Sequence, residues 1–259
     1  MSNTKIFSCL VGSHNYNLND ENSDKDYKVF TMPSFKDLYY NHMDSKMSVG
    51  ETEDFDTHDV RKLGQLLWKS NVNYMEILFS NEIIWHQEHS PLRVLFLPEI
   101  RNKIAKMNLP YLYKSCKGMY YNKMKYIHKG TSGTQHLVEK YGYDTKQALH
   151  AFRILDFCFK YAENGFSDFK EAITYDNSER EFMLSIKSGY FTFPQFEQMI
   201  ERKFVNQFLP LEETFFAQKE NEFTKLLLEA AIYNAVYDGI QKEVMGVERY
   251  EQGCKEERQ

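Results

Sequence analysis

Two aspartates two residues apart, Asp24 and Asp26, follow a glycine-serine pair at Gly12 and Ser13 after a short polar stretch. Side chains at positions i and i+2 of a strand share one face, so the two carboxylates can bind the same metal ion. Mg²⁺ prefers oxygen ligands and commonly bridges one or two carboxylates to the phosphates of a nucleotide. The exposed backbone N–H groups of a glycine-serine turn suit a phosphate. The segment therefore predicts a metal-dependent nucleotide-binding site.

A second group of residues that could take part in binding or catalysis is basic. Lys146, His150 and Arg153 occupy positions i, i+4 and i+7 of a predicted helix and therefore share one face. The rest of this helix is apolar nearly all round, which predicts that it is buried. A basic stripe on a buried helix needs an anionic counterpart, and a triphosphate suits a lysine charge, an arginine fork and a histidine donor. Internal ion pairing with Asp156 or Glu76 is the alternative.

The elements that must position these residues divide into strands and then helices. Apolar alternation predicts four strands, at Lys5–Val11, Asp24–Met32, Met47–Val49 and Glu53–Thr57. From Asp59 onward the apolar period becomes helical, and we expect the sheet to end before this point. The expected helices, bounded by proline and glycine, are Pro91–Lys106, Leu109–Lys129, Asp144–Asn164, Phe193–Gln207 and Glu212–Val247.

This order of elements predicts an α+β fold in which a small mixed β-sheet core with flanking helices is followed by a larger helical region. We expect residues 1–80 to form the sheet-bearing core. Residues 81–259 are expected to form a helical domain that completes the nucleotide and acceptor cleft.

Composition restricts the class of protein. The 259 residues are 42% hydrophobic, which supplies a core for one large domain or two modest ones. A net charge of -5 argues against a surface that binds polyanions everywhere, although a local basic groove stays open. Neither a signal-like N-terminus nor an apolar run of roughly 18 residues is found, so a membrane partner is not expected.

The cysteines are the last compositional feature that bears on function. They are far apart and form no Cys-x-x-Cys pair, at Cys9, Cys116, Cys158 and Cys254. This spacing suggests neither a structural zinc site nor a disulfide framework. A reducing compartment fits best, and we expect the protein to be cytoplasmic.

The motifs also carry a family resemblance. Residues 11–18 read Val-Gly-Ser-His-Asn-Tyr-Asn-Leu, and residues 23–27 read Ser-Asp-Lys-Asp-Tyr. This resembles the DNA polymerase beta-like nucleotidyltransferase superfamily, in which Gly-Ser, a short helix and Asp-x-Asp on the next strand follow one another. The closer resemblance is to its RNA-repair-associated branch. Asn17 stands where that branch usually has glycine, which is tolerable if the position is left-handed, and Val72 stands where proline is frequent.

Later segments support the same branch in the expected order. They are Asn73–Ser80, Tyr141–Lys146 together with His150 and Arg153, and, more weakly, Leu184–Gly189. Together the matches extend from about the start of the chain to residue 200. They are therefore much more specific than Asp-x-Asp alone.

The resemblance implies a set of metal ligands. Superfamily members transfer a nucleotidyl group from an NTP to a hydroxyl, using two Mg²⁺ ions held by three acidic residues, with Mn²⁺ as an alternative. The two ions lie roughly 3.5–4 Å apart and stabilise the attacking and leaving oxygens of an in-line displacement. Asp24 and Asp26 would be the shared ligands. Comparison with the family's Asp-x-Thr pattern aligns Asp54 best as the third ligand. Asp56, on the same face, is the reserve.

The resemblance also implies how phosphates are held. The backbone and hydroxyl of Gly12 and Ser13 would bind the outgoing pyrophosphate. The triphosphate would be bound by the basic stripe of Lys146, His150 and Arg153. His14 could cap the short helix or contact a phosphate. Glu76 is expected to be a structural acid that anchors the helical region, with a role in orienting Arg153 left open.

These expectations lead to three competing functions. The first is an Mg²⁺-dependent nucleotidyltransferase that adds a nucleoside monophosphate to an acceptor hydroxyl, with an RNA 3′ end such as that of tRNA suggested by the family. The second is transfer of AMP to a protein hydroxyl. The third is a nucleotide-binding sensor without turnover, which gains support if Asp54 and Asp56 both lie far from Asp24 and Asp26. The sequence leaves the oligomeric state open.

One further pattern bears on an RNA acceptor. Four lysines alternate with tyrosines in the predicted helix Leu109–Lys129, at Lys114, Lys117, Lys123 and Lys125. They could form a stacking and phosphate-binding surface for single-stranded RNA. The alternative is the ordinary hydrated face of an amphipathic helix.

Overall fold

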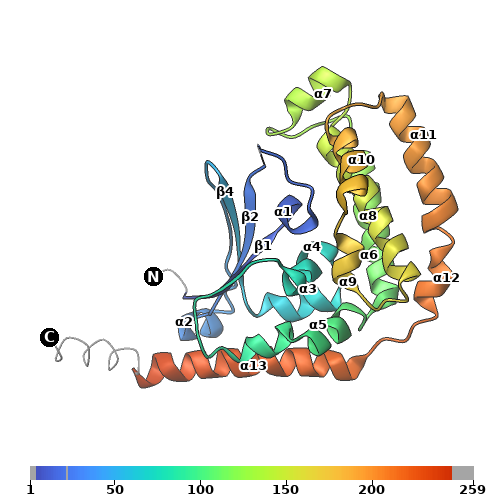
Figure 1. The fold of residues 1–259 in the computed structure, drawn as a ribbon. Helices are drawn as coiled ribbons and strands as arrows, with labels where there is room; N and C mark the ends of the chain where they lie inside the picture. The colour runs from blue at the N-terminus through green and yellow to red at the C-terminus, as the bar shows by residue number, and fades with distance from the viewer. Residues whose placement is uncertain (1–3, 22, 247–259) are drawn as a thin grey trace.

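A five-stranded mixed sheet and a larger set of helices make up the fold in the computed structural model, which describes residues 4–21 and 23–246 (Figure 1). The strands are β1 (Lys5–Val11), β2 (Lys25–Thr31), β3 (Ser45–Val49), β4 (Glu53–Asp59) and β5 (Ile83–Trp85). Their spatial order is β3-β4-β2-β1-β5, with β2 and β4 parallel and the other neighbours antiparallel. The predicted α+β class with a mixed sheet is confirmed.

The fifth strand differs from the prediction. The expectation that the sheet ends before Asp59 is wrong, because β5 pairs with β1 at the edge of the sheet. Its three residues, Ile83, Ile84 and Trp85, are β-branched or aromatic and therefore favour a strand. In a longer segment the same residue types would have indicated a strand clearly.

The helices surround one side of the sheet and extend away from it (Figure 1). The first half contains α1 (Ser13–Tyr16), α2 (Phe35–Tyr39), α3 (Lys62–Trp68), α4 (Val72–Met75), the 3₁₀-helices η1 (Glu76–Phe79) and η2 (Pro91–Phe96), α5 (Pro98–Ala105) and α6 (Leu109–Lys125). The second half contains α7 (Gln135–Tyr141), α8 (Thr145–Glu163), α9 (Phe169–Ile173), α10 (Asn177–Lys187), α11 (Phe193–Lys203), the π-helix η3 (Phe204–Phe208), α12 (Leu211–Phe216) and α13 (Glu222–Met245).

Three predicted helices, which became α6, α8 and α11 with η3, are confirmed within a few residues. Two others are divided. Pro98 separates η2 from α5, because proline suits the first turn of a helix and not its interior. The expected helix Glu212–Val247 is split into α12 and α13, and Val247 itself lies outside the described residues. The short helices α2, α7 and α9 and the longer α10 were not predicted.

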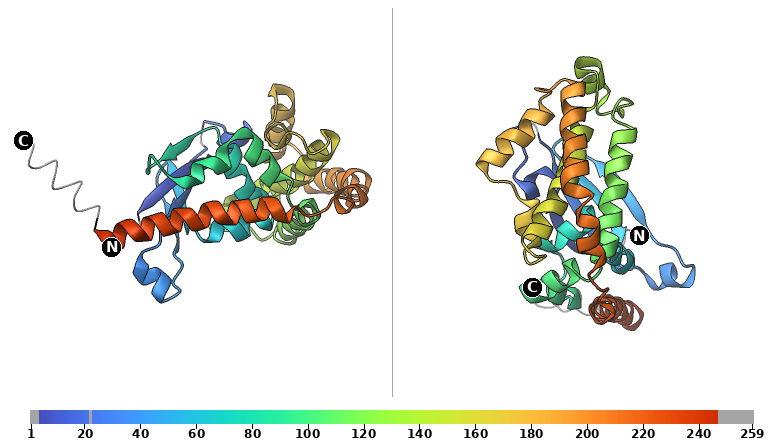
Figure 2. Two further views of the ribbon diagram at one scale, coloured as in Figure 1. Left: turned by 90° about the horizontal axis from the view of Figure 1, so that it is seen from below. Right: turned by 90° about the vertical axis from the view of Figure 1, so that its right-hand side faces the viewer.

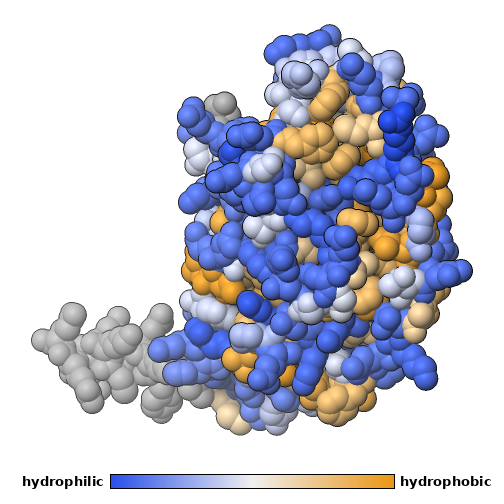
Figure 3. Space-filling view, turned by 45° about the vertical axis from the view of Figure 1, so that its right-hand side comes forward, coloured by the Kyte–Doolittle hydropathy of each residue, from blue (hydrophilic) through white to orange (hydrophobic). Residues whose placement is uncertain are grey.

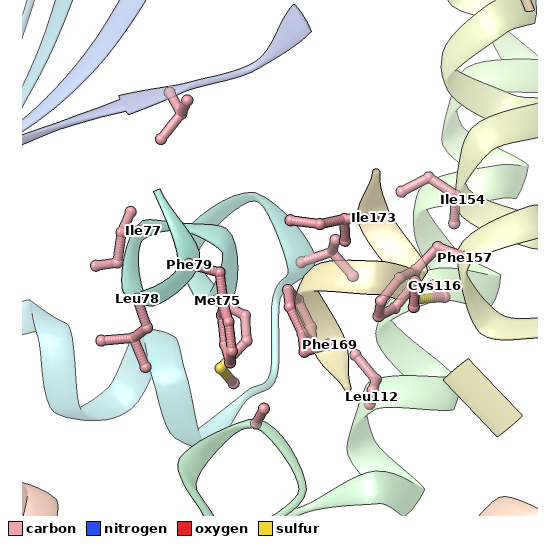
Figure 4. Packing of buried hydrophobic residues seen from close by; sticks show 14 of the residues in the cluster. Met75, Ile77, Leu78, Phe79, Leu112, Cys116, Ile154, Phe157, Phe169 and Ile173 are labelled. Atoms are coloured by element: carbon pink, nitrogen blue, oxygen red, sulfur yellow. The ribbon is translucent and has the colours of Figure 1, made fainter. Parts of the chain in front are cut away.

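One hydrophobic core joins the sheet-bearing half to the helices. Figure 4 shows side chains of η1 meeting those of α6, α8 and α9. The rings of Phe79 and Phe169 stack with centroids 4.7 Å apart, and Phe157 meets Phe169 at 5.0 Å. Each fully buried phenylalanine contributes about 1.5–3 kcal/mol. These contacts fix the position of α8 relative to the sheet.

The long helix α13 runs along one side of the molecule (Figure 2). It packs against α2, α3, α5 and η2. Gly239 lets it approach the end of β2, since a Cβ there would lie 2.7 Å from Sδ of Met32. Within residues 4–21 and 23–246, none of the helices combines the length and apolar character that a bilayer crossing requires.

Candidate functional site

The acidic residues gather at one end of the two central parallel strands. Asp26 on β2 is the in-register partner of Asp54 on β4, so the two side chains share one face on strands about 4.8 Å apart. Asp24 lies two residues earlier, immediately before β2. Burial raises the pKa of Asp26, and the negative charges of Asp54 and Asp24 raise it further, while Lys146 opposes the shift. The acids from both strands therefore act on one another through space.

Gly12 is required where β1 turns into α1. Its φ of +73° lies in the left-handed region, and a Cβ at this position would lie only 2.6 Å from Oδ2 of Asp26. A residue with a side chain would thus be strained and would also push against the carboxylate. The glycine-serine turn and Asp26 are in direct contact, as a shared metal and phosphate site needs.

The Gly12 N–H does not face a phosphate. It donates to Oε2 of Glu76 at 3.1 Å, so this part of the predicted phosphate-binding turn is already occupied by a protein carboxylate. Ser13 begins α1, and the N–H groups of the first turn have no partner within a helix. Any phosphate contact of the turn therefore falls to Ser13 and His14.

His14 connects the turn to the loop that leads to Asp24. Its Nε2 donates to the carbonyl oxygen of Ser23 at 3.1 Å. At the other end of α1, Asn17 has φ 63° and forms the left-handed C-cap. Asn17 therefore has the left-handed conformation under which asparagine is tolerable in place of the family's usual glycine.

Asp56 has partners of its own. Its Oδ2 lies 2.8 Å from Nζ of Lys28 and 2.9 Å from Nε2 of His58. Burial would raise the pKa of Asp56, but hydrogen bonds and charges from Lys28 and His58 outweigh it and hold the pKa below its usual value. Lys28 also lies over the ring of Tyr74, 4.2 Å from its centroid. Of the two candidates for the third acid, Asp54 is the one left beside Asp26.

The same sheet face becomes apolar further along the strands. Phe30 on β2 stacks on Phe7 with centroids 4.9 Å apart and lies 5.9 Å from the ring of His58. The pair formed by Lys28 and Asp56 thus separates the acidic end of the face from the hydrophobic core.

Two buried residues of opposite charge, Glu76 and Arg153, contact the Gly12 turn and the helix α1 that follows it. Glu76 is 2% exposed and accepts hydrogen bonds from the Gly12 N–H and, at 3.4 Å, from the Asn15 side chain. Burial raises the pKa of Glu76, and the positive charge of Arg153 opposes this. The guanidinium of Arg153 stacks 4.0 Å from the ring of Tyr16.

Arg153 thus lies deeper than a phosphate-binding stripe predicts. It is 3% exposed, and its Nε and Nη1 have no hydrogen-bond partner among the described residues. Its charge compensates Glu76, which was the alternative interpretation of this stripe. Lys146 and His150 lie nearer the surface, with Lys146 exposed and close enough to Asp26 to lower the pKa of that carboxyl.

The lysines of α6 do not form one surface. Lys117 pairs with Glu212 at 3.3 Å, and Lys114 lies over the ring of Phe216. Lys125 lies over Tyr126, whereas Lys123 is half-buried and faces Arg153 and Lys146. A continuous RNA-binding stripe along this helix therefore has no support in the arrangement of these side chains.

The three aspartates have the chemistry to bind divalent cations, but they are not preassembled into a metal site. Among residues 4–21 and 23–246, no three histidine, cysteine, aspartate or glutamate side chains are gathered tightly enough to form a ready-made metal site. Asp24 is exposed, however, and Asp26 and Asp54 are held in register on neighbouring strands, so the three carboxylates lie at the same end of the sheet. The carboxylates are hard oxygen ligands, and a cation would relieve their mutual repulsion.

None of the cysteines that the structure describes joins these acids in a metal-binding group. Cys9, Cys116 and Cys158 are buried free thiols, and burial raises the pKa of Cys9 and Cys158. Cys254 lies outside the described residues.

Comparison with known proteins agrees with this geometry. No curated protein matches the chain. A family model does match, over residues 3–221, a range that includes the acids of β2 and β4, the Gly12 turn and the cations of α8. The chain therefore belongs to RlaP, the RNA repair pathway DNA polymerase beta family.

Proposed function

We propose that this protein is a metal-dependent nucleotidyltransferase that moves a nucleoside monophosphate from an NTP to an acceptor hydroxyl. Family membership supports nucleotidyl transfer in general. The observation that carries the proposal for this chain is the register of Asp26 with Asp54, combined with the contact between Gly12 and Asp26. It joins two acidic strands and a helix-initiating turn in one place.

Each group has a distinct role. Asp24, Asp26 and Asp54 would hold Mg²⁺, or Mn²⁺ in its place, and such ions stabilise the attacking and leaving oxygens of an in-line displacement when bound. Asp54 would also accept the proton of the acceptor hydroxyl. Lys146, whose positive charge acts on Asp26, would neutralise phosphate charge. Ser13 and His14 offer the free N–H groups of α1 to the departing pyrophosphate.

The elements divide the work between two parts of the chain. We propose that residues 1–80 form the nucleotidyltransferase core and that residues 81–259 complete the cleft, in a cytoplasmic protein. The proximity of Lys146 on α8 to Asp26 supports this division of labour. The sheet itself extends slightly past residue 80 through β5.

The acceptor we favour is an RNA 3′ end, including that of tRNA, because the family is named for an RNA repair pathway. A protein hydroxyl is the second candidate, since both acceptors would use the same acids. A sensor without turnover would require Asp54 and Asp56 to be remote from the other acids. The register of Asp54 with Asp26 argues against that third function.

Incubation with each of the four labelled NTPs, Mg²⁺ or Mn²⁺, and either RNA or total protein tests the proposal. RNA with a free 3′-hydroxyl is compared with the same RNA carrying a 3′-phosphate. We expect label on the free 3′-hydroxyl only, and none with Asp26→Asn. Label on protein alone would select the second acceptor, and no transfer from any NTP to either acceptor would contradict the proposal.

A further inference from the structure

Five basic side chains from three helices face a common region beside the acids. Lys146, His150 and Arg153 come from α8, while Lys123 comes from α6 and Lys187 from α10, and α8 packs against both of these helices. Burial lowers the pKa of His150 well below its usual value, and the charges of the other four residues lower it further. The positive charge of this cluster therefore comes from the lysine and arginine side chains and not from His150.

Lys187 links this cluster to the loop that carries Asp24. Its Nζ lies 2.6 Å from Oδ2 of Asp20 and 3.4 Å from Oγ of Ser23. Ser23 is the residue before Asp24, so the ammonium lies at the edge of the proposed metal site. In Figure 1 the loop after α1 faces α10, in agreement with these contacts.

Lys123 is the α6 lysine that points inward. It is half-buried and forms no ion pair or hydrogen bond with any residue that the structure describes. Burial lowers its pKa, and the nearby charges of Arg153 and Lys146 lower it further, with only Asp144 opposing them. A lysine held among other cations costs stability unless an anion joins them. No carboxylate among the described residues pairs with Lys123, so an anionic ligand beside it would reduce this cost.

We propose that Lys123 and Lys187 bind the β- and γ-phosphates of the nucleotide and make the site select triphosphates over monophosphates. This inference rests on the proposed function, because the acids define where the α-phosphate lies. The two lysines reach the site from opposite neighbours of α8, so they can hold different oxygens of one phosphate chain. On binding, Lys187 exchanges its contact with Asp20 for one with phosphate.

Binding of inorganic tripolyphosphate and of orthophosphate to the full chain, measured by calorimetry with Mg²⁺ present, tests this without knowledge of the base. A charged hydrogen bond contributes about 1.5–3 kcal/mol, so Lys123→Gln and Lys187→Gln should each weaken tripolyphosphate binding by roughly 10- to 100-fold. Orthophosphate binding should not change. Lys125→Gln, on the outer face of α6, is the matched control and should stay within about twofold of the parent. Unchanged tripolyphosphate affinity in the two variants would overturn the inference.

Two further variants separate phosphate binding from a structural role. Lys123→Arg keeps the charge and should retain most of the affinity. Asp20→Asn removes the carboxylate that holds Lys187 and should leave tripolyphosphate binding equal or tighter. If Asp20→Asn weakens it as much as Lys187→Gln does, Lys187 acts only by holding the loop, and its assignment is wrong.

Failure of this inference and failure of the proposed function have different signatures. If the protein transfers label but its tripolyphosphate affinity is the same in both lysine variants, the proposed function holds and this inference is wrong. A protein that binds tripolyphosphate through both lysines but transfers no label keeps the inference and loses the function.

Discussion

Replacing Gly12 by alanine would place a methyl group against the carboxylate of Asp26. The Cβ would lie 2.6 Å from Oδ2 of Asp26, so the carboxylate must withdraw by about 0.8 Å to reach an ordinary contact of 3.4 Å. A displacement near 1 Å at a reacting centre can cost about 100-fold in rate. The φ of +73° adds strain of about 1–3 kcal/mol for a residue with a side chain. We therefore expect Gly12→Ala to lower both the transfer rate and the melting temperature.

Gly165→Ala is the matched control. Gly165 has a φ of +65°, and nothing lies within 4 Å of where its Cβ would be. It should also lose stability because of its positive φ, with a fall in melting temperature of roughly 2–4 °C per kcal/mol, and keep its activity. The assays are thermal unfolding and transfer of labelled nucleotide. Equal activity in the two variants would refute the idea that Gly12 exists to make room for Asp26.

Three other predictions concern charges in and near the site. Burial and neighbouring acids raise the pKa of Asp26, so its ionised form destabilises the metal-free fold at neutral pH. Asp26→Asn should therefore raise the melting temperature measured without metal and abolish transfer. A lower melting temperature would identify Asp26 as structural. Asp54→Asn should reduce transfer far more than Asp56→Asn, and the reverse ranking, measured at equal NTP, would reassign the third acid. Because the pKa of His150 is lowered in the folded chain, the unfolded chain binds a proton at His150 more readily, and the melting temperature should fall as the pH drops below about 6.5. In His150→Gln the melting temperature should depend less steeply on pH in this range. The same dependence on pH in the parent and the variant would contradict the lowered pKa.

The fold and the acids were predictable because their signals are local. The alternation of β2 and β4 and the spacing of Asp24, Asp26 and Asp54 are written in short stretches of sequence. Helix α8 was predicted for the same reason, because it is long and apolar nearly all round. β5 was missed since three residues are too few to establish a period.

The partners of the site residues depend on tertiary contacts and were only partly accessible. That Asp56 is taken up by Lys28 follows from the parallel register of β2 and β4, which a sequence pattern does not specify. The burial of Arg153 behind Tyr16 depends on where α1 meets α8. Lys187 lies in a weakly matching segment, and its nearness to Ser23 required the position of α10.

The face of the molecule in Figure 3 shows no single dominant apolar surface. On the face in Figure 3, hydrophilic residues predominate and apolar residues gather in several separate patches. The basic and acidic residues of the site are therefore identified by their mutual positions and not by an isolated patch. Function in this chain follows from the geometry of a few side chains.

Mn²⁺ binding tests the central claim most directly. A crystal structure with Mn²⁺ and a non-hydrolysable NTP analogue, read from the anomalous signal of manganese, locates the metal without reference to activity. We expect manganese between Asp24, Asp26 and Asp54, with the phosphate chain directed toward Lys146. Manganese bound elsewhere, or a nucleotide seated away from β2 and β4, would contradict the account.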